Sequence, residues 1–78
     1  MSDIFDALPP GPFAYMTTAP AGEHEGRGHV YIIDATGRKI GVCWGPPDTK
    51  LATVRMIIRA RDWADTPEGR AAIEKDTD

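Results

Sequence analysis

Four side chains that carry metal-ligating atoms lie close together in the first third of the chain. They are Glu23, His24, Glu25 and His29. Imidazole nitrogen and carboxylate oxygen both bind zinc and other divalent metals. The two histidines, however, join a Gly-rich segment to the start of a predicted strand, and no Cys-x2-Cys pair completes a structural zinc site. We therefore interpret the four residues as solvated loop residues and predict neither a metal site nor a cofactor.

A thiol and an imidazole could form a nucleophilic pair if Cys43 and His29 share one face of a hairpin, as strand alternation predicts. A lone strand cysteine is usually a small apolar packing residue, and no third group that would orient the base is evident. The nearby glycines, Gly37, Gly41 and Gly45, fit neither a dinucleotide-binding motif nor a P-loop. We therefore predict that the protein is not an enzyme, with no catalytic residue and no small-molecule substrate.

Basic residues concentrate in the centre of the chain. Residues 27–61 contain seven basic and two acidic residues, hence a charge of +5, whereas the whole chain carries −3. On the predicted helix, Lys50, Arg55, Arg59 and Arg61 could follow a phosphate backbone. Asp62 can pair with Arg59, and the acidic flanks compete with phosphate within a Debye length of about 8 Å. Nucleic-acid binding through the 27–61 segment is therefore the alternative hypothesis, and we expect none at physiological salt.

The length of 78 residues limits the chain to one modest hydrophobic core. A domain of this size buries only about 60% of the surface that its unfolded chain exposes, so it often needs a partner or self-association. Cys43 is the only cysteine, which excludes an internal disulfide and indicates a reducing compartment. No apolar run approaches the ~18 residues of a membrane span, and the acidic N-terminus is unlike a signal peptide. These features predict a cytoplasmic protein that does not bind membranes.

The elements that position these residues follow from turn and helix signals. The Pro-rich segment 8–12 cannot be helix or inner strand, so residues 1–12 form an extended acidic arm. A β-compatible run over 13–18 and an irregular loop over 19–28 come next. Residues 29–44 then predict a β-hairpin closed by Asp34-Ala-Thr-Gly37, in which only Gly37 needs a positive φ and Gly22 is unconstrained.

Two helices complete the predicted fold. Asp48 caps a helix over about 49–64, and Thr66 with Pro67 opens a weak helix that reaches about Lys75. The fold class is therefore α+β: a two- or three-stranded antiparallel sheet packed on one main helix, with a weak C-terminal helix. We assign one domain, with an arm over 1–12, a ββα-type core over 13–64 and a weak helix with an acidic tail over 65–78.

Alternation and helical phase assign the faces of these elements. The strand residues expected to face the helix are Val30, Ile32, Ile40, Val42 and Trp44, and those on the opposite face are Tyr31, Ile33 and Cys43. The helix presents a broad apolar arc to the core, formed by Leu51, Val54, Ile57, Ile58 and Ala64.

Another side of the same helix carries Ala52, Met56, Ala60 and Trp63, and one small sheet cannot cover both sides. This excess of apolar surface predicts a non-catalytic module that binds either a protein partner or a second copy of the chain, as a homodimer. The expected contacts are Met56, Ala60, Trp63 and Tyr31.

Three motifs resemble those of small uncharacterised proteins of bacterial genomes and prophages. They are Pro9-Pro10-Gly11-Pro12-Phe13, Ile33-Asp34-Ala35-Thr36-Gly37-Arg38, and Ala52-Thr53-Val54-Arg55-Met56-Ile57-Ile58-Arg59-Ala60. The resemblance spans about two thirds of the chain, and the sequence departs from it at Arg61-Asp62-Trp63-Ala64, where that family often has Ala-Pro-Asp-Leu-Leu. It implies an accessory protein of phage or mobile-element type and no catalytic residue.

Overall fold

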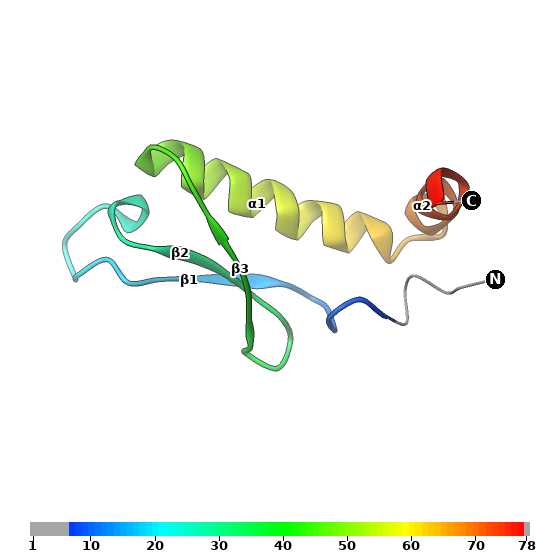
Figure 1. Cartoon of the computed structure of the whole chain (residues 1–78), viewed down its shortest axis with the longest axis horizontal. Coiled ribbons are helices and arrows are strands. Elements are labelled where there is room, and N and C mark those ends of the chain that lie inside the picture. The colour runs from blue at the N-terminus through cyan, green and yellow to red at the C-terminus, as the bar shows by residue number, and fades with distance from the viewer. Residues whose placement is uncertain (1–6, 78) are drawn as a thin grey trace.

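A computed structural model describes residues 7–77 of the chain. Its elements are β1 (Ala14–Thr17), the 3-10 helix η2 (Glu25–Arg27), β2 (Val30–Ile33), β3 (Lys39–Cys43), α1 (Pro47–Ala64) and α2 (Pro67–Thr77). The strands form an antiparallel sheet in the order β1-β2-β3, and α1 packs on one face of it (Figure 1). The α+β fold class predicted from the sequence is confirmed.

A β-bulge between β2 and β3 decides which side chains face the helix. Ile32 pairs with Gly41 but Ile33 pairs with Lys39, so β3 contains an extra residue at position 40. This shift places Cys43 opposite Val30, and Val42 opposite Tyr31. The predicted faces are therefore wrong beyond the bulge: Cys43 faces the core, Val42 lies on the outer face, and Trp44 is 77% exposed, whereas Ile40 packs against the core as predicted. Simple alternation fails because a bulge inverts the faces beyond it.

The hydrophobic core lies between the sheet and residues 51–58 of α1. Its buried members are Val30, Ile32, Cys43 and Val54, surrounded by the partly buried Phe13, Tyr15, Ile40, Leu51, Ile57 and Ile58. Val30 and Val54 are fully buried. The predicted apolar arc of the helix is confirmed for Leu51, Val54, Ile57 and Ile58, which contribute to this core, and its fifth member, Ala64, is buried outside this cluster.

The hairpin turn is organised by one buried carboxylate. Asp34 is 5% exposed, and its Oδ1 accepts hydrogen bonds from Thr36 N (2.9 Å), Thr36 Oγ1 (2.6 Å) and Arg38 N (3.0 Å). The adjacent amide of Ala35 donates to Pro10 O, which ties the N-terminal segment to the turn. Because these donors favour the charged carboxylate, the Thr36 hydroxyl above all, the pKa of Asp34 is lowered despite the opposing effect of desolvation.

This lowered pKa predicts an acid-sensitive hairpin. A carboxyl whose folded pKa lies below its unfolded value stabilises the fold above the unfolded value, about 3.9. That contribution is lost as the pH falls through the folded pKa. In thermal melts followed by circular dichroism between pH 7 and pH 2, we expect Asp34→Asn to lose less stability than the unmodified chain below about pH 4. Parallel acid profiles for the two proteins would contradict the assignment.

Two exposed turns require glycine to the same degree. Gly22 and Gly37 both have φ of +87°, and no atom lies within 4 Å of a Cβ built on either residue. The prediction that Gly22 is unconstrained is therefore wrong, since a side chain at either position would be strained by the backbone conformation alone.

The 19–28 segment packs against the start of α1 through η2, which the sequence did not predict. His24 Nδ1 accepts from Gly26 N at 3.0 Å, and His24 Nε2 lies 3.0 Å from Asp48 Oδ1. The helix begins at Pro47, one residue before Asp48, and Pro46 is its N-cap without a side-chain hydrogen bond. Asp48 is therefore a first-turn residue paired with His24, and the prediction that it caps the helix is wrong.

The C-terminal end of α1 extends beyond the sheet, and the molecule is elongated as a result (Figure 1). Its dimensions are 47 × 22 × 17 Å and its radius of gyration is 14.3 Å, against about 12 Å for a compact chain of this length. Arg61 holds the N-terminal segment at this end, because its guanidinium lies 5.4 Å from the Phe13 ring centroid and donates to Pro9 O.

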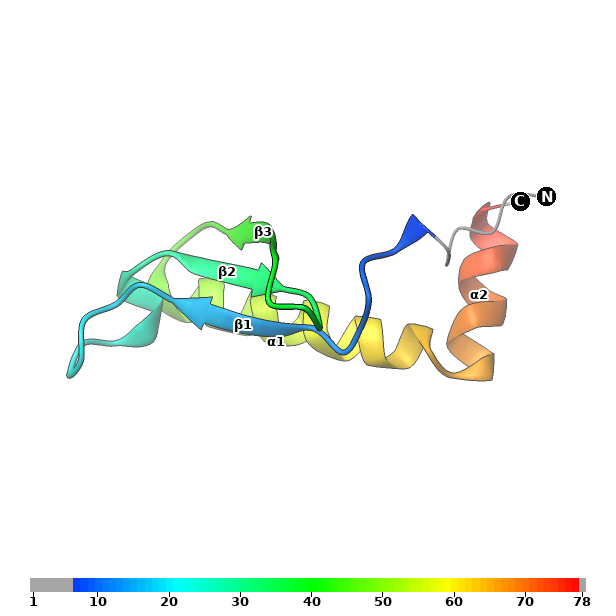
Figure 2. The ribbon, with the colours of Figure 1, turned by 90° about the horizontal axis from the view of Figure 1, so that it is seen from below.

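At its far end, α1 meets α2, which turns away from the long axis (Figure 2). Thr66 Oγ1 accepts from Gly69 N at 3.1 Å. The predicted helix start at Thr66 and Pro67 is confirmed.

Candidate functional site

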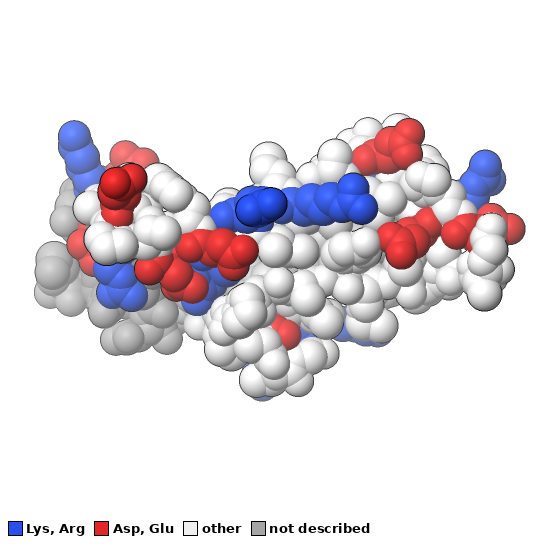
Figure 3. Space-filling view, turned by 180° about the vertical axis from the view of Figure 1, so that it is seen from behind, with Lys and Arg blue, Asp and Glu red and all other residues white. Residues whose placement is uncertain are grey.

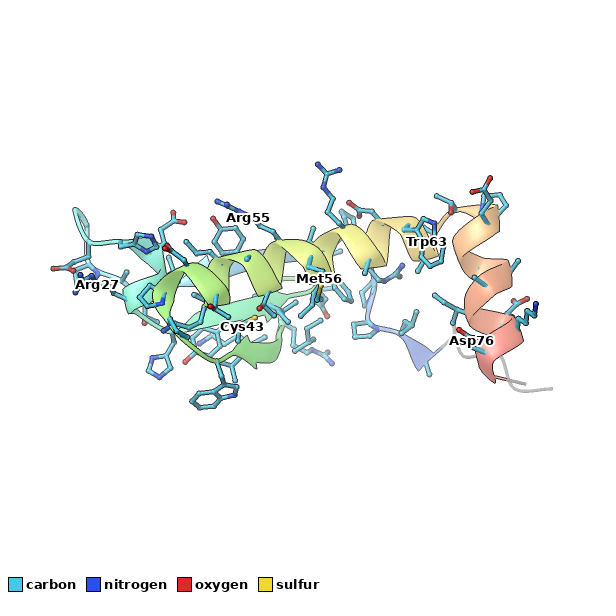
Figure 4. All side chains as sticks on the ribbon, turned by 90° about the horizontal axis from the view of Figure 1, so that it is seen from above. Arg27, Cys43, Arg55, Met56, Trp63 and Asp76 are labelled. Carbon is cyan, nitrogen blue, oxygen red and sulfur yellow. The ribbon has the colours of Figure 1, made fainter. Side chains whose placement is uncertain are left out.

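The side of α1 that faces away from the sheet carries a continuous row of uncovered apolar side chains. We call this row, Ala52, Met56, Ala60 and Trp63, the α1 strip. All four residues are exposed, Met56 to 63% and Trp63 to 48%. Figure 4 looks onto this part of the molecule, with Met56 and Trp63 along the helix and Arg55 beside them. The second apolar side predicted for the helix therefore exists, and among the described elements only α2 covers part of it, at Trp63.

Two arginines border the α1 strip on one side. Arg55 and Arg59 are exposed, one helical turn apart, and lie roughly 60–100° around the helix from Met56. The ion pairs found among the described residues include neither arginine, so the predicted pairing of Arg59 with Asp62 does not form there. Figure 3 shows basic atoms in a row along the middle of the molecule, with acidic atoms towards both ends.

One end of the α1 strip is supported by α2. Gly69 is buried and approaches Trp63 so closely that a Cβ on residue 69 would lie 3.0 Å from Trp63 Cδ2. The Thr66 hydroxyl donates to Trp63 O at 2.6 Å. These contacts fix the backbone around Trp63 while about half of its side chain stays accessible.

The outer face of the sheet carries a second group of apolar side chains. Tyr31 stacks on His29 with ring centroids 5.8 Å apart, and Lys39 Nζ lies 4.5 Å from the Tyr31 ring centroid. Its cross-strand neighbours are Met16 and Val42. This face and the α1 strip lie on opposite sides of the two-layer fold. The structure therefore brings together Met56, Ala60 and Trp63 of the predicted partner-binding residues, but not Tyr31.

The four basic residues proposed for nucleic acid do not form one surface. Lys50 Nζ donates to Gly28 O at 3.0 Å, beside the sheet. Arg61 pairs with Asp65, and its side chain is only 12% exposed. Arg55 and Arg59 remain as one isolated pair on the exposed side of α1.

Cys43 and His29 do not form a catalytic pair. Cys43 is a free, buried thiol on the core face, and desolvation raises its pKa. His29 is exposed and stacks on Tyr31 across the sheet from the core. Both residues line the same hollow of about 180 Å³, together with Trp44 and Lys50. A thiol held in its neutral form is a poor nucleophile, so this arrangement supports packing of Cys43.

The metal-ligating side chains near residue 24 do not converge either. Among residues 7–77, no three His, Cys, Asp or Glu side chains are grouped so that they could hold a metal ion. His24 bonds to the 3-10 helix and to Asp48, and thereby joins η2 to α1.

Comparisons with protein-family models, with curated proteins and with solved structures found no match. The resemblance to bacterial and prophage proteins therefore stays a prediction from the sequence motifs. In the described part of the chain, no helix combines the length and the apolar character needed to cross a membrane.

Proposed function

We propose that this protein is a non-catalytic interaction module that binds another protein through the α1 strip. The observation that carries the proposal is the exposure of Met56 and Trp63 on the side of α1 that the sheet does not cover. Full burial of one large apolar side chain is worth about 1.5–3 kcal/mol. Because Met56 and Trp63 are already partly buried, a partner that covers them gains about half of this value from each.

The composition of the α1 strip suits binding. Tryptophan and arginine are enriched among the residues that dominate interface energies, and Trp63 lies in a row bordered by Arg55 and Arg59. Methionine adapts its shape to irregular partners because its side chain is unbranched and polarizable. The helix that carries these residues is anchored by the core at Val54 and by α2 at Trp63, so the strip is presented on a rigid element.

Two further points belong to this proposal. We place the protein in the cytoplasm, since Cys43 is a free thiol and the chain has no second cysteine with which it could form an internal disulfide.

We rank nucleic acid below protein as the partner because Lys50 and Arg61 make contacts within the chain. Of the four basic residues, only Arg55 and Arg59 are left, and two are too few to follow a phosphate backbone.

Site-specific photo-cross-linking in the cells that make the protein tests the proposal. The photoreactive residue p-benzoylphenylalanine replaces Met56, and the adducts are identified by mass spectrometry. We expect one defined protein adduct, because a docked partner would lie against this side chain. An adduct with a second copy of the chain would show that the surface mediates self-association.

The matched control carries the same photoreactive residue at Glu23, which is exposed on the loop before η2. We expect no defined adduct from this position. Failure to obtain an adduct from position 56, or the same adducts from both positions in a folded protein, would refute binding through the α1 strip.

A further inference from the structure

We infer that the partner presents an amphipathic helix whose apolar face is bordered on one side by acidic side chains. This inference rests on the proposed function and names the kind of partner that the same surface fits. It follows from the shape of the α1 strip, from the position of its two arginines, and from the charge pattern that a second copy would bring.

The shape of the strip fits a helix. Its residues follow at spacings of four, four and three, so they form one straight row along α1. From Ala52 to Trp63 the row covers about three turns, or about 16 Å at 1.5 Å per residue. Because the side chains of Ala52 and Ala60 are small, the surface is recessed at these two positions, on either side of Met56. A partner helix with apolar residues at i, i+3, i+4 and i+7 can place its side chains in these positions.

The charge next to the strip is one-sided. Arg55 and Arg59 border it on one side, where the exposed Asp62 also lies, whereas the other side carries the uncharged Thr53. No hydrogen bond, ion pair or ring contact with another described residue engages either guanidinium. Glu or Asp at the facing border of a partner helix would form charge-assisted hydrogen bonds with them, and this arrangement would also fix the direction of docking.

A second copy of the chain is a poorer occupant. In an antiparallel pair related by a two-fold axis, the arginine borders of both copies meet on the same side of the interface, and like charges repel. In a parallel pair, the arginine border of one copy faces the threonine border of the other. The antiparallel pair also brings Asp62 to this border, which is one carboxylate for two guanidinium groups, and the parallel pair places no α1 carboxylate opposite the arginines.

Two synthetic helical peptides test the inference against the full-length chain. Both are 18 residues long and share one apolar face of leucine and alanine; one carries glutamate along a single border and the other carries lysine at the same positions. In fluorescence polarization at ~0.15 M salt, we expect the glutamate peptide to bind about tenfold more tightly or better, from two ion pairs and the repulsion of lysine. This preference should decrease as salt is added.

Variants of the chain separate the contribution of the two arginines from that of the apolar contact at Met56. Arg55→Gln with Arg59→Gln should remove the preference between the peptides, while Arg38→Gln, on the hairpin turn, should leave it unchanged. Met56→Asp should abolish binding of both peptides, with circular dichroism to show that the helix is retained.

Equal affinity for the two peptides would overturn the acidic partner but leave binding through the strip intact. Binding of neither peptide by a folded monomer would overturn the helical partner, and the cross-linking experiment would then decide the proposed function independently. A stable dimer that buries Met56, or tight nucleic-acid binding that is lost in the Arg55/Arg59 variant, would also overturn it.

Discussion

Replacement of Gly26 by alanine is expected to destabilise the whole domain, by on the order of 3 kcal/mol. Gly26 is buried in η2, and a Cβ built on it would collide with Pro47 O and lie 2.6 Å from the carbonyl carbon and Cα of the same residue. These are backbone atoms in the first turn of α1, so no side-chain rotation relieves the overlap. The chain must separate η2 from α1, which also breaks the bond between His24 and Asp48.

The loss is large relative to the whole stability of a chain this short. At 0.05–0.15 kcal/mol per residue, 78 residues give about 4–12 kcal/mol of unfolding free energy. Urea denaturation followed by circular dichroism measures the change. The control is Gly41→Ala, because the nearest atom to its Cβ is Ile32 Cδ1 at 3.4 Å, which is an ordinary contact with the end of a side chain and not with backbone. Similar midpoints for the two variants would show that η2 does not pack closely on α1.

Local sequence signals predicted the order and type of the main elements. Thr66 and Pro67 mark the start of α2 because the threonine hydroxyl accepts from a first-turn amide and proline needs no donor there. The Asp34 to Gly37 turn was predicted because a carboxylate accepts from the amide two residues later and glycine adopts a positive φ; the structure adds a bond from the amide of Arg38. Both signals depend on atoms only a few residues apart, which is why sequence alone is sufficient.

The faces of β3 could not be derived in this way. The bulge at Ile40 depends on how two strands meet across the hairpin, and it places Cys43 in the core and Trp44 in solvent. The packing of η2 on α1 is likewise a contact between distant segments. A buried glycine, Gly26, allows it, yet a glycine in a polar loop looks like an ordinary turn residue in the sequence.

The candidate site was predicted where helical phase alone determines position. Met56, Ala60 and Trp63 lie together because α1 is regular through that region. Helical phase also predicts the side of α1 on which each basic residue lies. At 100° per residue, Lys50 and Arg61 fall within the arc of Val54, so they point towards the sheet side and not towards Arg55. Tyr31 belongs to the sheet layer, and its distance from the α1 strip follows from the layered fold.

The second large effect is expected from Gly69→Ala, where helix propensity and packing oppose each other. Alanine stabilises an α-helix interior by about 1 kcal/mol relative to glycine, so propensity alone predicts a more stable α2. A Cβ on residue 69, however, would collide with Trp63 O and lie 2.7 Å from the Trp63 carbonyl carbon. Because these are backbone atoms of α1, we expect packing to dominate and α2 to separate from the end of α1.

The expected damage is local, because the main contact of α2 is with α1, whereas the core lies between α1 and the sheet. Hydrogen exchange should show loss of amide protection over 70–77 with protection retained over 30–43. Ala71→Gly is the matched control: it lowers helix propensity by about 1 kcal/mol at an exposed position without adding atoms. If Gly69→Ala instead increased protection of α2, the close contact with Trp63 would be refuted. Loss of α2 should also weaken peptide binding to the α1 strip, since Trp63 would lose the contact with Gly69 that supports it.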